Sequence, residues 1–283
     1  MGSHKETPRV RACLFDMDGL LIDSEDRYTQ ITNEVLRKYG KPDLPWSIKA
    51  QLQGRPGPEA SKIFHEWAQL PITPEQTLQM QASLQEKYFA LCQPLPGVPA
   101  LLSNLVSTQS TDQPVYIALA TSSNSRNFKL KSDHLSELFS AFPQKHRVLG
   151  DDPRIGKGRG KPLPDIYLLA LETINAELRS KGETEITPAE CLVFEDAVPG
   201  VEAGRRAGMQ VIWCPHPGLL EACRGREEEV LAGRTGQHKE QDGDSPAELI
   251  QSAGSPGEVG DGWAELLGTL ENFPYEQYGI RIP

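Results

Sequence analysis

The chain has 283 residues, of which 38% are hydrophobic and 24% are charged, as in an ordinary globular protein with a sizeable core. Its formal net charge of −10 argues against a dedicated binder of nucleic-acid polymers, because an acidic surface repels a phosphate backbone. No stretch approaches the roughly 20 apolar residues that span a bilayer, and the N-terminus has no apolar signal region, so we expect no membrane association.

Four short apolar runs predict buried β-strands, at residues 10–15, 115–120, 191–194 and 209–213. Helical patterns separate them, at residues 97–107, 164–179 and 198–207. Strands that alternate with helices predict an α/β fold with a doubly wound, Rossmann-like parallel sheet. In such a sheet, ligands bind in the crevice outside the carboxyl ends of the strands.

The segment between the first and second predicted strands has a different pattern. Helical spacing recurs at residues 25–39, 57–69 and 74–91, with almost no strand signal. Pro94 and Gly97 then mark the return to the α/β pattern. We therefore predict a core of residues 1–23 and 94–283, interrupted by an all-helical cap at residues 24–93.

Residues 224–262 are rich in Gly, Glu, Gln, Ser and Asp and poor in large apolar side chains. Such a composition cannot bury a core, so we predict a mostly disordered insertion here. A solvated loop without function is favoured over a partner-binding segment. Residues 263–273 regain helical spacing and predict a short helix that docks back on the core.

The five cysteines are odd in number and form no CxxC pair. Cys13 and Cys191 lie inside predicted strands and are interpreted as small core residues. We expect reduced thiols and a cytoplasmic location, with the nucleus as the other option. We also expect a monomer.

The first candidate for chemistry is the segment DMDG at residues 16–19. Asp16 and Asp18 stand two residues apart just past a buried strand, and Gly19 allows a tight turn. Most Asp–x–Asp pairs are turns or helix caps. Here the preceding strand is apolar to its last residue, so the two carboxylates are expected to point into the ligand crevice.

Two further strand or loop positions suit a phosphate group. Thr121 follows the second strand, and its hydroxyl and the backbone N–H groups around Ser122 could bind phosphate oxygens. An N-cap for the next helix fits the same pattern. Lys161 lies between Gly160 and Pro162 and could neutralise a bound phosphate, although most exposed lysines are simply solvated.

Glu195 and Asp196 follow the third predicted strand directly. Adjacent carboxylates repel each other unless a cation lies between them or water screens them. Hard oxygen ligands beside a phosphate site suit Mg²⁺.

In this order, the DMDG segment, Thr121, Lys161 and the acidic pair at 195–196 resemble the four motifs of the haloacid dehalogenase superfamily. The resemblance covers nearly the whole chain, apart from residues 224–262. The helical segment is similar to the cap of β-phosphoglucomutase-like members. The segments VLGDDPRIGKGRGKPLPDIYL and CLVFEDAVPGVEAGRRAGMQVI resemble the subgroup that includes pseudouridine-5′-phosphatase.

The resemblance implies a Mg²⁺-dependent phosphatase that acts on a small-molecule phosphate ester. Asp16 would attack phosphorus and form an aspartyl-phosphate. Asp18 would protonate the leaving oxygen and then deprotonate the attacking water. Mg²⁺ would be bound by the Asp16 carboxylate, the Asp18 backbone carbonyl and Asp196, with Glu195 close by or through water.

The resemblance also assigns the remaining binding groups. Thr121, Ser122 and Lys161 would hold the phosphoryl oxygens, where charge is spread in the transition state. The helical domain would close over the site, and its loop around Gly54 and Arg55 would recognise the leaving group. A solvent-exposed Arg55 without contact to substrate remains the alternative.

Two other functions remain open. A sugar phosphomutase would share every motif named, because it also phosphorylates Asp16. A non-catalytic binding protein on the same fold would be expected to have lost Asp16, Asp18 or Asp196, and none of them is lost.

Overall fold

The computed structural model describes residues 7–54, 57–237 and 253–283. Its centre is a six-stranded sheet in the order β3-β2-β1-β4-β5-β6, in which every neighbouring pair is parallel. The strands are β1 (Ala12–Phe15), β2 (Tyr116–Ala120), β3 (Arg147–Val148), β4 (Cys191–Glu195), β5 (Gln210–Trp213) and β6 (Ala264–Leu266). The predicted α/β fold with a parallel sheet is thus confirmed.

The two faces of the sheet are covered by separate sets of helices. Side chains alternate along β1, so that Cys13 and Phe15 pack into one apolar cluster and Ala12 and Leu14 into the other. The first cluster includes α5 (Val98–Ser107) and α7 (Ser136–Phe139). The second includes α8 (Asp165–Lys181), α9 (Val198–Arg206), α10 (Pro217–Ala222) and α11 (Glu227–Leu231).

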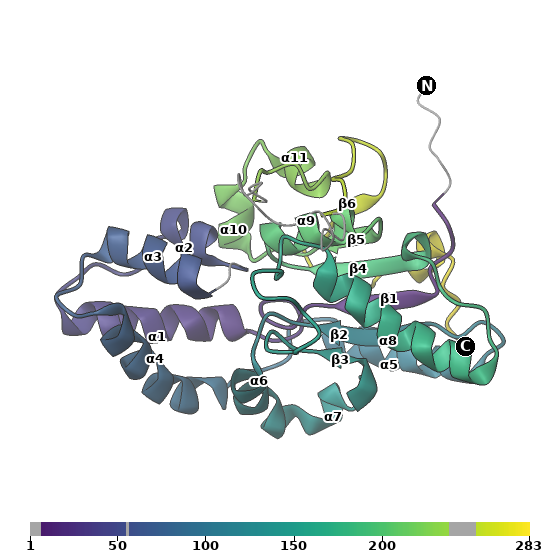
Figure 1. Ribbon diagram of the computed structural model, residues 1–283, viewed down its shortest axis with the longest axis horizontal. Coiled ribbons are helices and arrows are strands. Elements are labelled where there is room, and N and C mark those ends of the chain that lie inside the picture. Colours follow the sequence, from purple (N-terminus) through teal and green to yellow (C-terminus); the bar gives the residue numbers. More distant parts are fainter. Residues whose placement is uncertain (1–6, 55–56, 238–252) are drawn as a thin grey trace.

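Four helices inserted after β1 form the cap, which lies at the left end of the molecule in Figure 1. They are α1 (Ser24–Lys38), α2 (Trp46–Leu52), α3 (Gly57–Ala68) and α4 (Pro74–Phe89). Helix α2 was not predicted, because seven residues are too few for a clear period. Its Trp46 stacks on His216 of the core at 4.5 Å between ring centroids. The cap therefore packs against the core beside α10.

Helix α6 (Ser125–Ser132) follows β2 and lies below the sheet in Figure 1, next to α4 of the cap. Asn124 caps its N-terminus by accepting a hydrogen bond from the backbone N–H of Asn127 at 2.9 Å. Single 3₁₀ turns span Thr108–Ser110, Asp133–Leu135, Gln144–His146, Pro188–Glu190 and Tyr275–Tyr278.

The C-terminal segment corrects one prediction. Residues 263–273 have helical spacing, but they contain strand β6 instead of a helix. The edge of β5 decides this, because its backbone groups need partners. The Val211 N–H donates to the Trp263 carbonyl at 2.9 Å, and the Leu267 N–H donates to that of Trp213 at 2.9 Å. Leu270 and Phe273 still reach the core.

The predicted disorder of residues 224–262 is wrong for both described flanks, while residues 238–252 lie outside the described residues. The N-terminal flank contains α11, whose Val230 is only 2% exposed. In the C-terminal flank, Asp261 accepts a hydrogen bond from the buried guanidinium of Arg205. A polar composition misled the prediction, because a few apolar and ionic contacts fix these flanks.

We expect Val230→Ala to lower the free energy of unfolding by about 1.5–3 kcal/mol, because it removes two buried methyl groups and leaves a cavity. The matched control is Val259→Ala, since Val259 lies in the other flank and is 56% exposed. We expect that change to cost less than about 0.5 kcal/mol. Urea unfolding measures both, and equal small effects would contradict the packing of α11 on the core.

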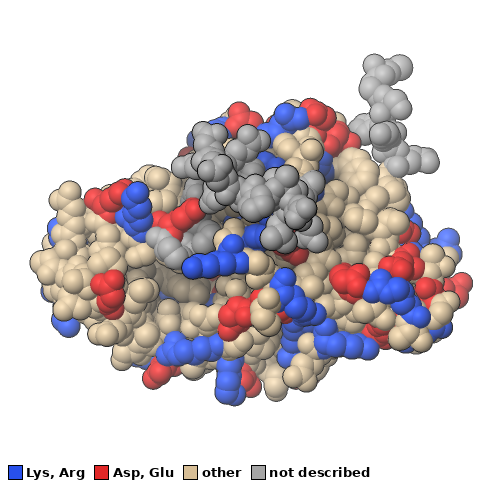
Figure 2. Space-filling view, in the orientation of Figure 1, with Lys and Arg blue, Asp and Glu red and all other residues tan. Residues whose placement is uncertain are grey.

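Acidic and basic side chains are interspersed over the face of the molecule that Figure 2 shows. All five cysteines are free. Among the described residues, no helix is long and apolar enough to cross a membrane.

Candidate active site

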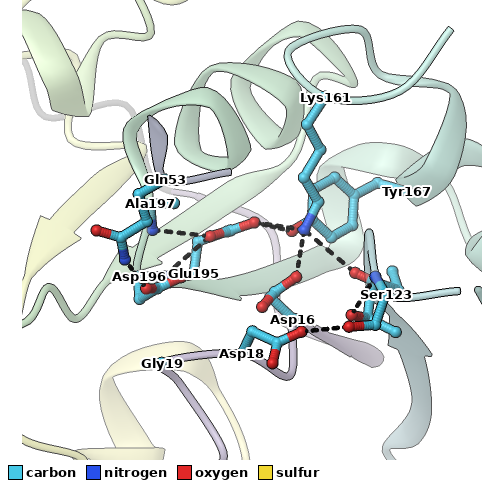
Figure 3. Close-up of polar contacts among 12 residues, drawn as sticks. Asp16, Asp18, Gly19, Gln53, Ser123, Lys161, Tyr167, Glu195, Asp196 and Ala197 are labelled. Carbon is cyan, nitrogen blue, oxygen red and sulfur yellow. Dashed lines mark hydrogen bonds and ion pairs between the residues drawn. The ribbon is translucent and has the colours of Figure 1, made fainter. Parts of the chain in front are cut away.

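The carboxyl ends of three adjacent strands bring the predicted motif residues together. Asp16 follows β1, Thr121 follows β2, and Glu195 and Asp196 lie at the end of β4. Because β1 lies between β2 and β4, these side chains meet at one edge of the sheet. Lys161 reaches the same point from the loop before α8 (Figure 3).

Lys161 lies between two carboxylates. Its Nζ donates to Asp16 Oδ1 at 2.5 Å, to Glu195 Oε1 at 2.6 Å and to the Ala120 carbonyl at 3.2 Å. The side chain is buried, and burial by itself lowers the pKa of a lysine. Asp16 and Glu195 more than offset this effect, so the pKa of Lys161 is raised and the group stays charged.

Glu195 is held at both oxygens by protein donors. Oε1 accepts hydrogen bonds from Lys161 and, at 2.7 Å, from the Tyr167 hydroxyl. Oε2 accepts from the backbone N–H groups of Asp196 at 2.9 Å and Ala197 at 3.0 Å. A Cβ on Gly200 would overlap this carboxylate, so glycine is needed there. Glu195 is therefore itself held in place and fixes the position of the Lys161 ammonium group.

Asp16, Glu195 and Asp196 bring carboxylate oxygens within 4.8 Å of one another, and all three residues are buried. Burial is the main cause that raises the pKa of Asp16 to about 7, and the neighbouring carboxylates add to it. Burial, Glu195 and Asp16 also raise the pKa of Asp196 well above its usual range. A bound cation would remove this penalty, so the cluster is a candidate metal site.

The free oxygens of this cluster fit a hard divalent cation. Within the described part of the chain, the hydrogen bonds to Asp16 end on Oδ1, from Lys161, and those to the Asp196 carboxylate end on Oδ2, from Gln53 Nε2. One oxygen of each carboxylate therefore remains for a metal ligand bond. Both oxygens of Glu195 are already engaged, which suits a place outside the direct ligands.

Gly19 has two reasons to be glycine. Its φ of +76° lies in the left-handed region, which other residues rarely adopt. A Cβ at this position would also overlap Asp196 Oδ2. The turn after β1 can therefore pass directly beside the β4 carboxylate.

Both oxygens of the Asp18 carboxylate accept hydrogen bonds. Oδ1 accepts from the Ser24 hydroxyl at 2.6 Å and from Lys131 Nζ. Oδ2 accepts from the Ser123 hydroxyl at 2.6 Å (Figure 3). Burial by itself raises the pKa of Asp18, but Lys131 and the two hydroxyls outweigh it and lower the pKa. Asp18 thus lies beside Asp16 in a very different electrostatic setting.

Two of the three predicted phosphate-binding residues, Thr121 and Ser122, lie in the turn after β2. Thr121 is buried, and its Oγ1 accepts a hydrogen bond from the Ser123 N–H at 3.1 Å. Ser122 is exposed and lines the same cavity as Asp16.

In the cap, Gly54 lines that cavity too, and its φ of +73° brings the loop close to Ala197. Arg55 lies outside the described residues.

A cavity of about 420 Å³ connects the strand ends with the cap. Its core wall includes Asp16, Asp18, Ser122, Ser123, Lys161 and Asp196. Its cap wall combines apolar and polar side chains, including Leu52, Gln53, Phe64, His65, Leu78 and Gln81. A small molecule bound here would contact both parts of the protein.

Four contributors to the site were missed from the sequence: Gln53, Ser123, Lys131 and Tyr167. Lys131 and Gln53 lie in segments without a motif, and their contacts are long-range, at sequence separations of 113 and 143. Tyr167 lies six residues after Lys161, in the predicted helix. Its hydroxyl group, on a helix face made mostly of apolar side chains, was the one signal that could have identified it.

Comparison with known proteins agrees with this geometry. The family model of haloacid dehalogenase-like hydrolases matches residues 10–208. A probable pseudouridine-5′-phosphatase of Saccharomyces cerevisiae is 48% identical over 271 residues, which cover 96% of this chain and 98% of the relative. A (DL)-glycerol-3-phosphatase of Arabidopsis thaliana is 34% identical over 221 residues, which cover 77% and 68%.

Solved structures show the same fold. The crystal structure of a putative β-phosphoglucomutase from Thermotoga maritima superimposes with a TM-score of 0.54 at 30% identity. The match covers 78% of this chain and 97% of that structure. The chain therefore belongs to the haloacid dehalogenase-like hydrolase family.

Proposed function

We propose that the protein is a Mg²⁺-dependent phosphomonoesterase that acts on a small phosphorylated metabolite through an aspartyl-phosphate on Asp16. The observation that carries this is the position of the Asp16 carboxylate at the end of β1. It is buried, its Oδ1 accepts a hydrogen bond from Lys161, and its side chain lines the cavity. Asp18 lies on the same cavity wall, two residues further along the chain.

In the first step, an Asp16 oxygen forms a bond to phosphorus and the bond from phosphorus to the ester oxygen breaks. The leaving oxygen takes a proton from Asp18, which must take up that proton when the substrate binds, because its pKa in the free protein is lowered. Lys161, Thr121 and Ser122 bind the phosphoryl oxygens, whose negative charge would otherwise repel Asp16. This requires Lys161 to exchange part of its contact with Asp16 for the phosphoryl group.

In the second step, water attacks phosphorus and the bond to Asp16 breaks. Asp18, now a carboxylate, takes the proton from that water, so Asp16 returns as a carboxylate and inorganic phosphate leaves. One group thus serves as acid and then as base. Its place on the wall of the cavity, next to Asp16, supports this double role.

Asp16 Oδ2, Asp196 Oδ1 and the Asp18 backbone carbonyl would hold the Mg²⁺ ion, with Glu195 outside the direct ligands. When bound, the ion supplies positive charge that offsets the repulsion between the Asp16 carboxylate and the anionic ester. The buried acidic cluster and its raised pKa values support this assignment.

For the leaving group, we infer a nucleoside or a sugar rather than a smaller alcohol. The first candidate for the substrate is therefore pseudouridine 5′-phosphate. Two findings support it: the identity to a probable pseudouridine-5′-phosphatase and a cavity of about 420 Å³. Pockets of this size suit ligands larger than glycerol phosphate. Phe64 offers an apolar ring, and His65 and Gln81 offer polar contacts, on the cap wall.

A sugar phosphomutase is the second candidate, favoured by the likeness to the putative β-phosphoglucomutase structure. The two reactions share the first step and differ in the acceptor, which is water in one and a second sugar hydroxyl in the other. We expect steady release of inorganic phosphate from pseudouridine 5′-phosphate or a sugar monophosphate with Mg²⁺. Added sugar bisphosphate should not stimulate it.

A panel of phosphate esters, including glycerol phosphate and hexose phosphates, measures the preference by released phosphate. The Asp16→Asn protein, purified in the same way, controls for contaminating phosphatases. An isomerised sugar phosphate with little free phosphate would favour the mutase instead. No turnover of any ester by the wild-type protein would contradict both.

A further inference from the structure

Lys131 is a fully buried lysine outside every predicted motif, with a relative exposure of 0%. It lies near the end of α6, and its Nζ contacts Asp18 Oδ1, the Ser123 hydroxyl at 2.7 Å and the Tyr28 hydroxyl at 3.1 Å. Removing an ammonium group from water is costly unless charge and hydrogen bonds compensate. Asp18 supplies the only carboxylate oxygen among its described hydrogen-bond partners.

Lys131 and the two serines enclose the Asp18 carboxylate. Lys131 donates to Oδ1 and to Ser123, and the Ser123 hydroxyl donates to Oδ2, so the two oxygens are linked through one lysine and one serine. The Ser24 hydroxyl also donates to Oδ1 and accepts from the Gly19 N–H at 3.2 Å. These contacts fix the rotation of the carboxyl group about its side-chain bonds.

The same lysine joins the cap to this arrangement. Its Nζ lies 4.8 Å from the ring centroids of Tyr28 in α1 and Phe89 in α4, in cation–π contact with both. The two rings pack edge to face at 5.0 Å. The position of Asp18 therefore depends on a core helix and on two cap helices at once.

We propose that Lys131 is a positioning residue that holds Asp18 in the orientation required for proton transfer to the leaving oxygen. The inference rests on the proposed phosphatase reaction, in which Asp18 gives that proton. Proton transfer needs the donor within hydrogen-bond reach of the ester oxygen, and a displaced group loses much of its effect. Lys131 does not contact the reacting atoms in this mechanism.

The test compares leaving groups, because only a poor leaving group needs a proton. Rapid-quench measurement of the first turnover follows release of phenol from phenyl phosphate and of nitrophenol from 4-nitrophenyl phosphate. In Lys131→Met, we expect phenol release to slow about tenfold to a hundredfold, as for loss of a hydrogen bond to a charged group. Nitrophenol release should stay within about threefold, and KM for both should change little.

The matched control is Lys129→Met, two residues away on the same helix. Lys129 is exposed and pairs with Asp133 at the surface, so both rates should equal those of the wild type. Circular dichroism and thermal unfolding check that each variant folds. An equal loss on both substrates would overturn the proposal and leave Lys131 a purely structural role.

A second variant keeps the test decisive if Lys131→Met does not fold. Tyr28→Phe removes the hydroxyl that contacts Lys131 and keeps the ring that packs on Phe89. We expect a smaller loss, again on phenyl phosphate alone, and unchanged rates would overturn the proposal. If the wild-type protein cleaves neither these two esters nor any ester of the panel, the proposed phosphatase function itself fails, which is a different result.

Discussion

Asp16→Asn should lower the turnover of the best phosphate ester by at least about 10⁴-fold while the protein stays folded. Loss of a nucleophile has effects of this size, because an amide carries no anionic oxygen to attack phosphorus. Phosphate release and circular dichroism, measured on the same preparation, check it. Wild-type turnover by a well-folded variant would contradict the role of Asp16.

The same variant also tests how the charge of Asp16 affects the stability of the fold. The pKa of Asp16 is raised to about 7, so ionised Asp16 opposes folding, and stability falls as the pH rises from about 4 through 7. In metal-free buffer at pH 8, Asp16→Asn should therefore melt at or above the wild-type temperature. Asp133→Asn, a change at an exposed carboxylate that pairs with Lys129, is the control and should leave turnover unchanged.

Removal of divalent metal should abolish turnover, and Mg²⁺ should restore it. The reason is the cluster of Asp16, Glu195 and Asp196. Among the described residues, Lys161 is the one cationic side chain that forms an ion pair with a carboxylate of this cluster. Ca²⁺ should inhibit, because it accepts more ligands at longer distances and would bind both oxygens of Asp16. Phosphate release in EDTA, Mg²⁺ and Ca²⁺ measures these effects.

Thermal unfolding gives a second readout that does not depend on turnover. Mg²⁺ at a hundred times its dissociation constant should stabilise the wild-type protein by about 2.7 kcal/mol. Asp196→Asn should lose most of this gain, because it replaces a charged ligand by an amide. Full activity in excess chelator, or an equal gain in both proteins, would argue against a metal site at this cluster.

The sequence determined the position of the chemistry along the chain. Four polar residues follow or end an apolar run: Asp16, Thr121, Glu195 and Asp196. Because the strands are parallel, their carboxyl ends lie at one edge of the sheet. Local pattern suffices here because β1, β2 and β4 are apolar up to their carboxyl ends, so the first strongly polar residue marks each end. The alternation of strands and helices fixed the α/β fold in the same way.

The tertiary structure decided the conformation of two segments near the β5–β6 edge of the sheet. Residues 263–273 have helical spacing, yet they donate to and accept from β5 as strand β6. Residues 224–237 have the composition of a disordered segment, yet Val230 is buried against the core. An open sheet edge and an uncovered apolar face are properties of the folded core, and local pattern does not contain them.

The partners of the site residues were likewise beyond the sequence. Lys131 meets Asp18 across 113 residues, Tyr167 meets Glu195 across 28, and Gln53 meets Asp196 across 143. None of these pairs has a fixed spacing, since they depend on how the cap, α6 and α8 pack against the strand ends. The sequence by itself therefore determined which carboxylates meet at the strand ends, because the end of each strand is visible in the local pattern. Only the tertiary packing, within the core and between cap and core, decided how each carboxylate is held, because long-range contacts set its hydrogen bonds and its charge.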